Sequence, residues 1–428
     1  MEIITRLIFR YNSALRKISY ALVIRFLGLI FSFFLTFILL DILEARDLGI
    51  FYFIISLARL SSIFLSLGTF AAIIPEYSQS SDENKNSLLI TSIFPAIFLS
   101  IVGLISINLI FFFFNESLIE TFWYIPLFSI LVACYLLQFN LYHYFNCKEQ
   151  LALTSFMLEG NGRNFFFLPS ILFFYFFLDP SKLDLRLIVN LLIISSVLSV
   201  LIGLFNYDFK NLIKAFSFRT FKKFHFVGIK FFPSVLVSTG APSIYEIFIN
   251  YFFGPVALAV LGVANRVLSP LMIHNDLLVL NFAKASKFFK SNNKNSANSL
   301  HIRSIIFSFS IALILLIIFY IFGYDIVSEL LDFQKLPFIR EVIMLFFLST
   351  IFQSICNFSL HFLRNIGDYI SMTYIETFAV LLTISAMVFV SDLGIIGAAL
   401  AILFGRMFMQ ISGFFYTKVK YGIPFFKE

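Results

Sequence analysis

Long apolar runs recur along the whole chain and are separated by short polar segments. Each run holds about 20 residues or more, the length that a helix needs to cross a bilayer. None shows the strict apolar-polar alternation of a membrane strand. The pattern predicts twelve spanning helices, at residues 18–40, 50–74, 88–114, 121–146, 153–178, 186–207, 225–253, 255–283, 300–322, 341–362, 369–390 and 394–417.

The composition supports a membrane location. The chain has 428 residues, of which 60% are hydrophobic and 13% are charged, whereas soluble domains carry about 25% charged residues. Because this much apolar surface cannot be covered in water, lipid must surround a large part of it. We therefore expect an all-α polytopic membrane protein, in which the first apolar run is a retained span rather than a cleaved signal.

The basic residues fall unevenly between the loops on the two sides of the predicted membrane. With the N-terminus placed in the cytoplasm, twenty Lys and Arg lie on cytoplasmic segments and five on the opposite side. Such an excess marks the cytoplasmic side, so we expect both termini there. The net charge of +7 is then a topology signal, and nucleic acid is not an expected partner.

Two basic segments, at 208–224 and 284–303, are the richest in Lys and Arg. The first separates the sixth and seventh predicted spans, so we expect it to link two six-helix bundles at 1–207 and 225–428. Basic clusters beside a membrane attract anionic headgroups. Membrane lipids are therefore expected partners of both segments.

Motifs of soluble enzymes and ATPases are absent from the sequence. It has no GxxxxGK[ST], no HExxH and no GxSxG, the signatures of phosphate-binding loops, zinc proteases and serine hydrolases. The five histidines and three cysteines are scattered without ligand spacing. No predicted outside loop is long enough for a catalytic domain. We expect neither an enzyme, a metal site nor a bound cofactor.

Several charged residues lie inside the predicted spans. An ionised side chain at mid-bilayer costs at least about 2.5–3.5 kcal/mol, so such residues usually face a protein interior or water. Lys230 is close enough to a span end to reach the headgroups. Basic residues outnumber acidic ones, which favours a mildly cationic cavity for an anionic substrate. The substrate-binding candidates are Arg25, Arg59, Arg163, Arg266 and Arg406, and the candidates for ion coupling or charge pairing are Glu159, Glu246, Asp276 and Glu376.

The stretch "SFMLEGNGRNFFFLP" (155–169) places Glu159 and Arg163 in one predicted span. Their four-residue spacing puts them on one face of a continuous helix. Either they form a neutralised pair that packs helices, or Arg163 faces the cavity and exchanges Glu159 for a substrate phosphate, which suits the planar guanidinium. Gly160 and Gly162 would allow close approach of another backbone or of the substrate.

Two further spans carry polar residues at the same spacing. They are Arg406 with Gln410 in the last span and Glu246 with Asn250 in the seventh. The seventh span also holds Pro233, Gly240 and Pro242. Proline removes a backbone hydrogen bond and kinks a helix. The kink is either static or a hinge. In transporters, broken helices commonly line the site or act as hinges.

Four segments carry a resemblance to a known family. They are "LEARDLGIFYFIISLARLSSIFLSLGTFAAIIPEYSQ" (43–79), "YFFGPVALAVLGVANRVLSP" (251–270), "LRNIGDYI" (363–370) and "SDLGIIGAALA" (391–401). In order and spacing they resemble the Wzx-type polysaccharide flippases of the multidrug/oligosaccharidyl-lipid/polysaccharide (MOP) exporter superfamily. The first is marked by Asp47, Leu48 and Gly49 with Phe51 and Tyr52 soon after.

The resemblance implies a MATE-like fold of two six-helix bundles around a central cavity that opens alternately to each side. It implies a bacterial inner-membrane location and an undecaprenyl-pyrophosphate-linked oligosaccharide, an O-antigen or capsule unit, as cargo. The resemblance also implies coupling to H+ or Na+. Expected partners are a polysaccharide polymerase and a chain-length regulator. The five arginines named above would meet pyrophosphate or acidic sugars.

Two alternatives stay open. A cation-coupled exporter of drugs or other small molecules has the same fold, but its cationic cargo favours a cavity dominated by acids. A membrane enzyme such as an O-antigen polymerase is expected to have a long outside loop with arginines, which the predicted topology lacks.

Overall fold

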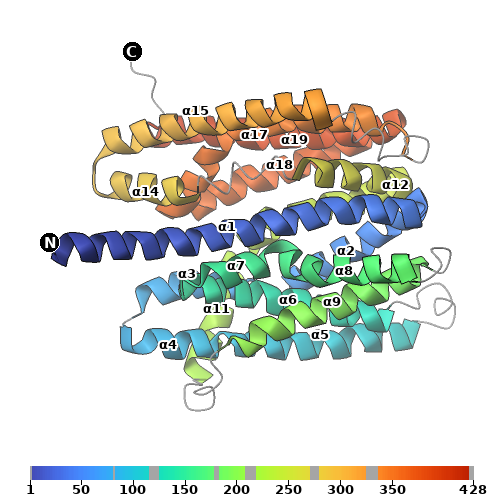
Figure 1. Cartoon of the computed structure of the whole chain (residues 1–428), viewed down its shortest axis with the longest axis horizontal. Helices are drawn as coiled ribbons and strands as arrows, with labels where there is room; N and C mark the ends of the chain where they lie inside the picture. Colours follow the sequence, from blue (N-terminus) through green and yellow to red (C-terminus); the bar gives the residue numbers. More distant parts are fainter. Residues whose placement is uncertain are drawn as a thin grey trace. The chain divides into compact units, whose positions relative to one another are not determined.

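The computed structural model describes residues 2–80, 82–114, 125–177, 183–207, 218–269, 279–323 and 336–423. Within these ranges every regular element is a helix (Figure 1). Ten helical segments among them are long and apolar enough to cross a membrane. The all-α, membrane-spanning class predicted from the sequence is therefore confirmed, while the orientation of the termini stays a prediction.

The chain divides into two compact units. Unit 1 comprises Met1–Leu35 and Ile54–Gly240, and unit 2 comprises Thr36–Phe53 and Ala241–Glu428. The first helix, α1 (Glu2–Ile42), and the second, α2 (Ala45–Ser66), each contribute to both units. The turn between these two helices thus belongs to unit 2, although most of α1 and α2 belongs to unit 1.

Unit 1 is built from helices that pack pairwise, α5 on α6, α6 on α9, α8 on α9 and α11 on α3. Its core gathers aromatic and aliphatic side chains such as Phe70, Tyr144 and Phe145. Besides the parts of α1 and α2, its elements are α3 (Thr69–Gln79), α4 (Asp82–Thr91), α5 (Ile93–Phe114), α6 (Ile125–Cys147), α7 (Leu151–Met157), the 3-10 turn η1 (Leu158–Gly160), α8 (Asn161–Phe177), α9 (Leu185–Phe205) and α11 (Phe218–Ser238).

Unit 2 is organised around α19, which packs on α17, α18 and α12. A second layer pairs α14 with α15, and α15 packs on α17. The elements are α12 (Ala241–Leu268), α14 (Val279–Lys290), α15 (Lys294–Ile318), the π-helical turn η5 (Phe319–Gly323), α17 (Ile339–Ile366), α18 (Tyr369–Phe389), the 3-10 turn η6 (Ser391–Leu393) and α19 (Gly394–Tyr421).

Two predicted spans are interrupted inside their expected bounds, at or beside glycine. The span at 153–178 is interrupted where Gly160 adopts φ +82°, a left-handed conformation that glycine alone enters without steric cost. The span at 225–253 breaks at Thr239–Gly240, between α11 and α12. Pro242 then lies in the first turn of α12, where proline has no backbone bond to lose, whereas Pro233 stays within α11.

The boundary predicted between the seventh and eighth spans is confirmed. Gly254 interrupts α12 with φ 82° and ψ 173°, and Pro255 follows it. The halves expected at 1–207 and 225–428 stay a prediction, because residues 208–217 of the expected linker lie outside the described part of the chain.

Candidate functional site

In unit 1 the candidate site forms where α7 ends and α8 begins. Arg163 occupies the first turn of α8, and its Nη1 donates a hydrogen bond of 2.6 Å to the hydroxyl of Tyr135 on α6. A Cβ on Gly160 would lie 3.0 Å from Nη2 of Arg163, so the guanidinium covers this glycine. The Nε of Arg163 is buried and makes no hydrogen bond.

The electrostatics of this helix start favour an anion. The first turn of a helix carries a partial positive charge from its backbone N–H groups. A guanidinium in the same turn adds a full positive charge, and the two repel each other unless an anion lies between them. Anion binding at helix N-termini uses these two sources of positive charge together.

The shared helix face expected for Glu159 and Arg163 is wrong, because η1 and the positive φ of Gly160 separate the two residues. Whether their side chains pair stays a prediction. Their four-residue spacing therefore does not place them on one helix face. The side chain of Glu159 lies outside the described part of the structure.

Close packing fixes the start of α8 from two sides. A Cβ on Gly162 would lie 2.5 Å from the Ser199 hydroxyl of α9, so the neighbour at this glycine is a side chain rather than the backbone or substrate expected there. On the other side a Cβ on Gly28 of α1 would lie 2.6 Å from the side chain of Asn161. Arg25 is three residues before Gly28 and so lies on the same side of α1.

The remaining cationic candidate of unit 1 is Arg59, in the middle of α2. Both Arg59 and Arg25 are half-buried and make side-chain interactions within the protein. Among the described side chains inside the membrane-depth helices of unit 1, the charged candidates are thus Arg25, Arg59 and Arg163, all cationic.

In unit 2 the turn region of α1 and α2 docks on α12 through Tyr52. The Cζ of Arg266 lies 3.8 Å from the ring centroid of Tyr52, a cation-π contact. Nη1 of Arg266 also donates to the Gly262 carbonyl at 3.1 Å. A Cβ on Gly49 would lie 1.9 Å from the Pro255 carbonyl oxygen. The beginning of the motif segment at 43–79 thus meets the motif segment at 251–270 in this unit.

A second polar cluster in unit 2 joins α12, α18 and α19. Nη2 of Arg406 donates to Oδ1 of Asn265 at 3.3 Å, and Arg406 interacts electrostatically with Tyr245 and Glu246. Tyr245 in turn hydrogen bonds Thr383 and interacts with Glu376.

Glu376 is 5% exposed, so its carboxyl group is inside the protein. The candidates described in unit 2 are therefore two arginines, Arg266 and Arg406, and two glutamates, Glu246 and Glu376. Asp276, the remaining acidic candidate, lies outside the described residues. The cluster around Arg406 thus holds one arginine and two glutamates, whereas Arg266 belongs to the contact with Tyr52.

Some polar partners were not expected from the sequence. Tyr135 and Tyr245 contact the predicted arginines from other helices, and helical spacing gives no signal for such contacts. Glu76 is buried and forms an ion pair with the exposed Lys223 of α11. The sequence offered one indication that Glu76 matters, because this residue lies in the "PEYS" part of the motif segment at 43–79.

Comparisons with known proteins show which solved structures share this fold. The family model MatE matches residues 233–389. No curated protein sequence matches the chain. A solved structure described as the inward-facing conformation of a multidrug resistance MATE family transporter of the MOP superfamily has a TM-score of 0.68 at 15% identity. The match covers 94% of this chain and 98% of that one.

Two further solved structures have the same fold. One is a MOP superfamily transporter from Pyrococcus furiosus, with a TM-score of 0.60 and 14% identity, covering 94% of this chain and 95% of that one; its description reports reverse polarity of the binding pocket. The other is the lipid II flippase MurJ in an inward closed conformation, with a TM-score of 0.64 and 15% identity. The match covers 94% of this chain and 87% of that one. The MATE-like fold predicted from the sequence is confirmed.

Proposed function

We propose that this protein is a flippase that moves an undecaprenyl-pyrophosphate-linked oligosaccharide from the cytoplasmic to the outer leaflet of a bacterial inner membrane. Drug exporters and lipid flippases share this fold. The fold therefore does not distinguish a drug from a lipid-linked cargo, and the choice depends on the site. The observation that carries the proposal is Arg163 in the first turn of α8, with a buried Nε that makes no hydrogen bond.

A phosphate is the ligand that this arrangement suits best. The guanidinium edge and the helix start would both donate to phosphate oxygens, and charge-assisted hydrogen bonds of this kind are about twice as strong as neutral ones. Tyr135 holds the other side of the guanidinium in place. The positive charge of Arg163 supports the same cargo class, because a cationic drug would be repelled beside it.

The alternative is a cation-coupled exporter of small cationic molecules. The buried Glu376 favours this alternative, since a carboxylate attracts a cationic cargo. In the proposed flippase Glu376 instead serves H+ or Na+ coupling. The polymerase and the chain-length regulator stay proposed partners of the flippase.

Deletion of the protein in its host, followed by extraction of lipid-linked sugars, tests the proposal. We expect a complete lipid-linked oligosaccharide to accumulate, unreactive toward a membrane-impermeant probe of the outer leaflet. Normal export without accumulation, together with new drug sensitivity, would support the exporter instead. Accumulation of single units on the outer leaflet would indicate a polymerase.

The Arg163→Ala and Arg163→Lys variants extend this test to the site. Both should reach the membrane, and both should accumulate the same intermediate, since a lysine ammonium lacks the planar fork of arginine. Lys222→Ala, on the exposed face of α11, is the matched loss of a positive charge. It should export normally.

A further inference from the structure

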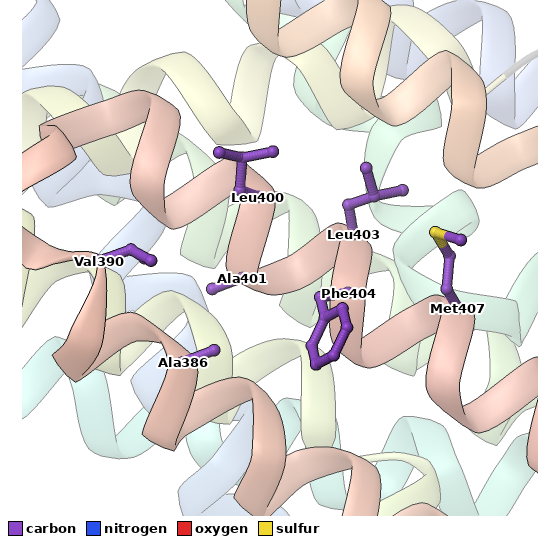
Figure 2. A pocket seen from close by; sticks show the side chains of 7 residues that line it. All are labelled: Ala386, Val390, Leu400, Ala401, Leu403, Phe404 and Met407. Atoms are coloured by element: carbon purple, nitrogen blue, oxygen red, sulfur yellow. The ribbon is translucent and has the colours of Figure 1, made fainter.

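An apolar groove lies between α18 and α19 in unit 2 (Figure 2). Its volume is about 320 Å³, which is within the range of about 300–1,000 Å³ that is usual for small-ligand pockets. Both helices are candidate membrane spans, and Phe404 is 55% exposed. Figure 2 shows the lining side chains, which are Ala386 of α18, Val390 directly after this helix, and Leu400, Ala401, Leu403, Phe404 and Met407 of α19.

A second hollow adjoins the groove, because Leu400 lines both. Its volume is about 510 Å³, and Met344, Leu345 and Ile396 contribute apolar lining. Arg340 and Glu341 lie at its edge. Both are exposed and belong to the first turn of α17.

The hollow lies at one end of the helices of unit 2. Helix α17 begins at Ile339, α18 ends at Phe389 and α19 begins at Gly394. Consecutive antiparallel helices joined by short turns bring these three ends together. Because the ends of spanning helices meet the headgroup layer, the charged pair is at headgroup level and the apolar groove extends from it into the hydrocarbon.

The charges at the hollow select among lipid headgroups. Arg340 and the start of α17 attract a phosphate, whereas Glu341 repels one. A pyrophosphate, with its higher negative charge, is therefore disfavoured. A headgroup that joins one phosphate to one primary ammonium complements both residues.

We propose that this groove is a binding site for an ethanolamine phospholipid. One acyl chain occupies the groove between α18 and α19, the phosphate lies at Arg340, and the ammonium lies at Glu341. The site is separate from the arginine site of unit 1 and does not depend on the identity of the cargo. A lipid bound there would stabilise the contact between α18 and α19.

The test uses the purified, delipidated full-length protein in detergent and measures binding of individual lipids by native mass spectrometry. Phosphatidylethanolamine should bind about two- to fivefold more tightly than phosphatidylglycerol of the same chains, the effect of one partly exposed charge pair. Equal binding of the two lipids would mean an unselective lipid surface and would overturn the proposal. Tighter binding of undecaprenyl phosphate, sensitive to the same substitutions, would also overturn it.

Substitutions locate the site. Glu341→Gln should abolish the preference for phosphatidylethanolamine, and Arg340→Gln should weaken both phospholipids; both side chains are exposed, and thermal unfolding of each variant checks that the fold is kept. Ala386→Phe should fill the groove and weaken both phospholipids. Leu381→Phe enlarges an exposed residue of α18 outside the groove and should change nothing. Unchanged selectivity in Glu341→Gln, or unchanged binding in Ala386→Phe, would contradict the proposal.

Discussion

At the scale of single residues, the position of Arg163 depends on a glycine three residues earlier. Gly160 has φ +82°, and its Cα faces the guanidinium so closely that a Cβ would lie 3.2 Å from Cζ of Arg163. The glycine therefore ends one helical segment, lets α8 begin, and leaves room for the charged group. Its backbone conformation and its missing side chain serve the same site.

We expect Gly160→Ala to reduce transport far more than it reduces stability. Alanine in a left-handed conformation costs about 1–2 kcal/mol, and its Cβ would displace the guanidinium from Tyr135. Lipid-linked sugar accumulation and thermal unfolding in detergent measure the two effects. Gly367→Ala is the matched control, because Gly367 has φ +94° and nothing within 4 Å of its Cβ position. It should lose similar stability and keep transport. Equal transport in the two variants would remove Gly160 from the site.

The residue scale also shows what the sequence could predict. Arg163 could be identified because a charge inside an apolar run is costly. Its partner could not, because Tyr135 is on another helix and is one of many tyrosines in the chain. Only the helix face that Arg163 was expected to share with Glu159 was predicted wrongly, since one residue with positive φ interrupts the helical periodicity on which that prediction depends.

At the scale of helices, glycines permit a close crossing in unit 1. A Cβ on Gly228 of α11 would lie 2.9 Å from the Cα of Thr69 at the start of α3. A Cβ on Gly68 would lie 2.3 Å from the Gly228 carbonyl oxygen. The atoms in contact are backbone atoms, so neither helix can yield by a rotamer change. The ion pair of Glu76 with Lys223 joins the same two helices.

Gly228→Ala should therefore destabilise the protein by about 1–3 kcal/mol, the usual cost of overpacking. Thermal unfolding in detergent measures this loss. Gly103→Ala is the comparison, because the atom that its Cβ would meet is Cδ1 of Leu65, at 2.7 Å, the movable end of a side chain. If both variants unfold at the same temperature, backbone contact at this crossing does not limit stability.

A hydrogen-bonded cluster joins the turn before α18 to the end of α19. Asp368 accepts hydrogen bonds from the hydroxyl of Tyr421 at 2.6 Å and from Nζ of Lys420 at 2.9 Å. Burial alone would raise the pKa of Asp368, but these bonds, the Ser371 contact and the charge of Lys420 lower this pKa from 3.8 to about 2.

Because the pKa of Asp368 is lower in the folded protein, its stabilising effect is present above about pH 3.8 and is lost as the pH falls toward about 2. The unfolding temperature of the wild type should therefore fall more steeply across this interval than that of Asp368→Asn. Thermal scans of both proteins at matched pH measure the difference. Parallel curves would show that the cluster does not contribute to acid sensitivity.

Element boundaries were predictable where glycine and proline stand together and less so elsewhere. Gly254 and Pro255 interrupt α12 at the boundary that the apolar pattern predicts. Pro233, by contrast, remains inside α11, and the break falls at Thr239–Gly240. A proline in an apolar run can therefore mark a break several residues away, because helix packing decides which turn opens.

At the scale of the whole molecule, the candidate residues are divided between the two units. Arg25, Arg59, Glu159 and Arg163 belong to unit 1, whereas the described candidates of unit 2 are two arginines and two glutamates that interact with tyrosines and an asparagine. The sequence identified these charges as one set. Their division between units requires the three-dimensional contacts, since α1 and α2 each contribute to both.

We propose that cargo binding and ion coupling use different residues, Arg163 in unit 1 and Glu376 in unit 2. If Glu376 carries the coupling ion, Glu376→Gln should still bind lipid-linked oligosaccharide but should lose the response of transport to an imposed H+ or Na+ gradient. Arg163→Gln should lose cargo binding. Reconstitution in proteoliposomes, with leaflet-specific detection of the cargo, measures transport, and a binding assay in detergent measures affinity.

This assignment requires Glu376→Gln to lose only the response to the ion gradient and Arg163→Gln to lose cargo binding. Glutamine keeps the size of glutamate and removes its charge, so a folded Glu376→Gln protein isolates the role of the carboxylate. Gradient-dependent transport that persists in Glu376→Gln would exclude this residue as the coupling site. Loss of cargo binding in Glu376→Gln would instead mean that the glutamate and Arg163 act on the same ligand, and the separation of roles between the units would be wrong.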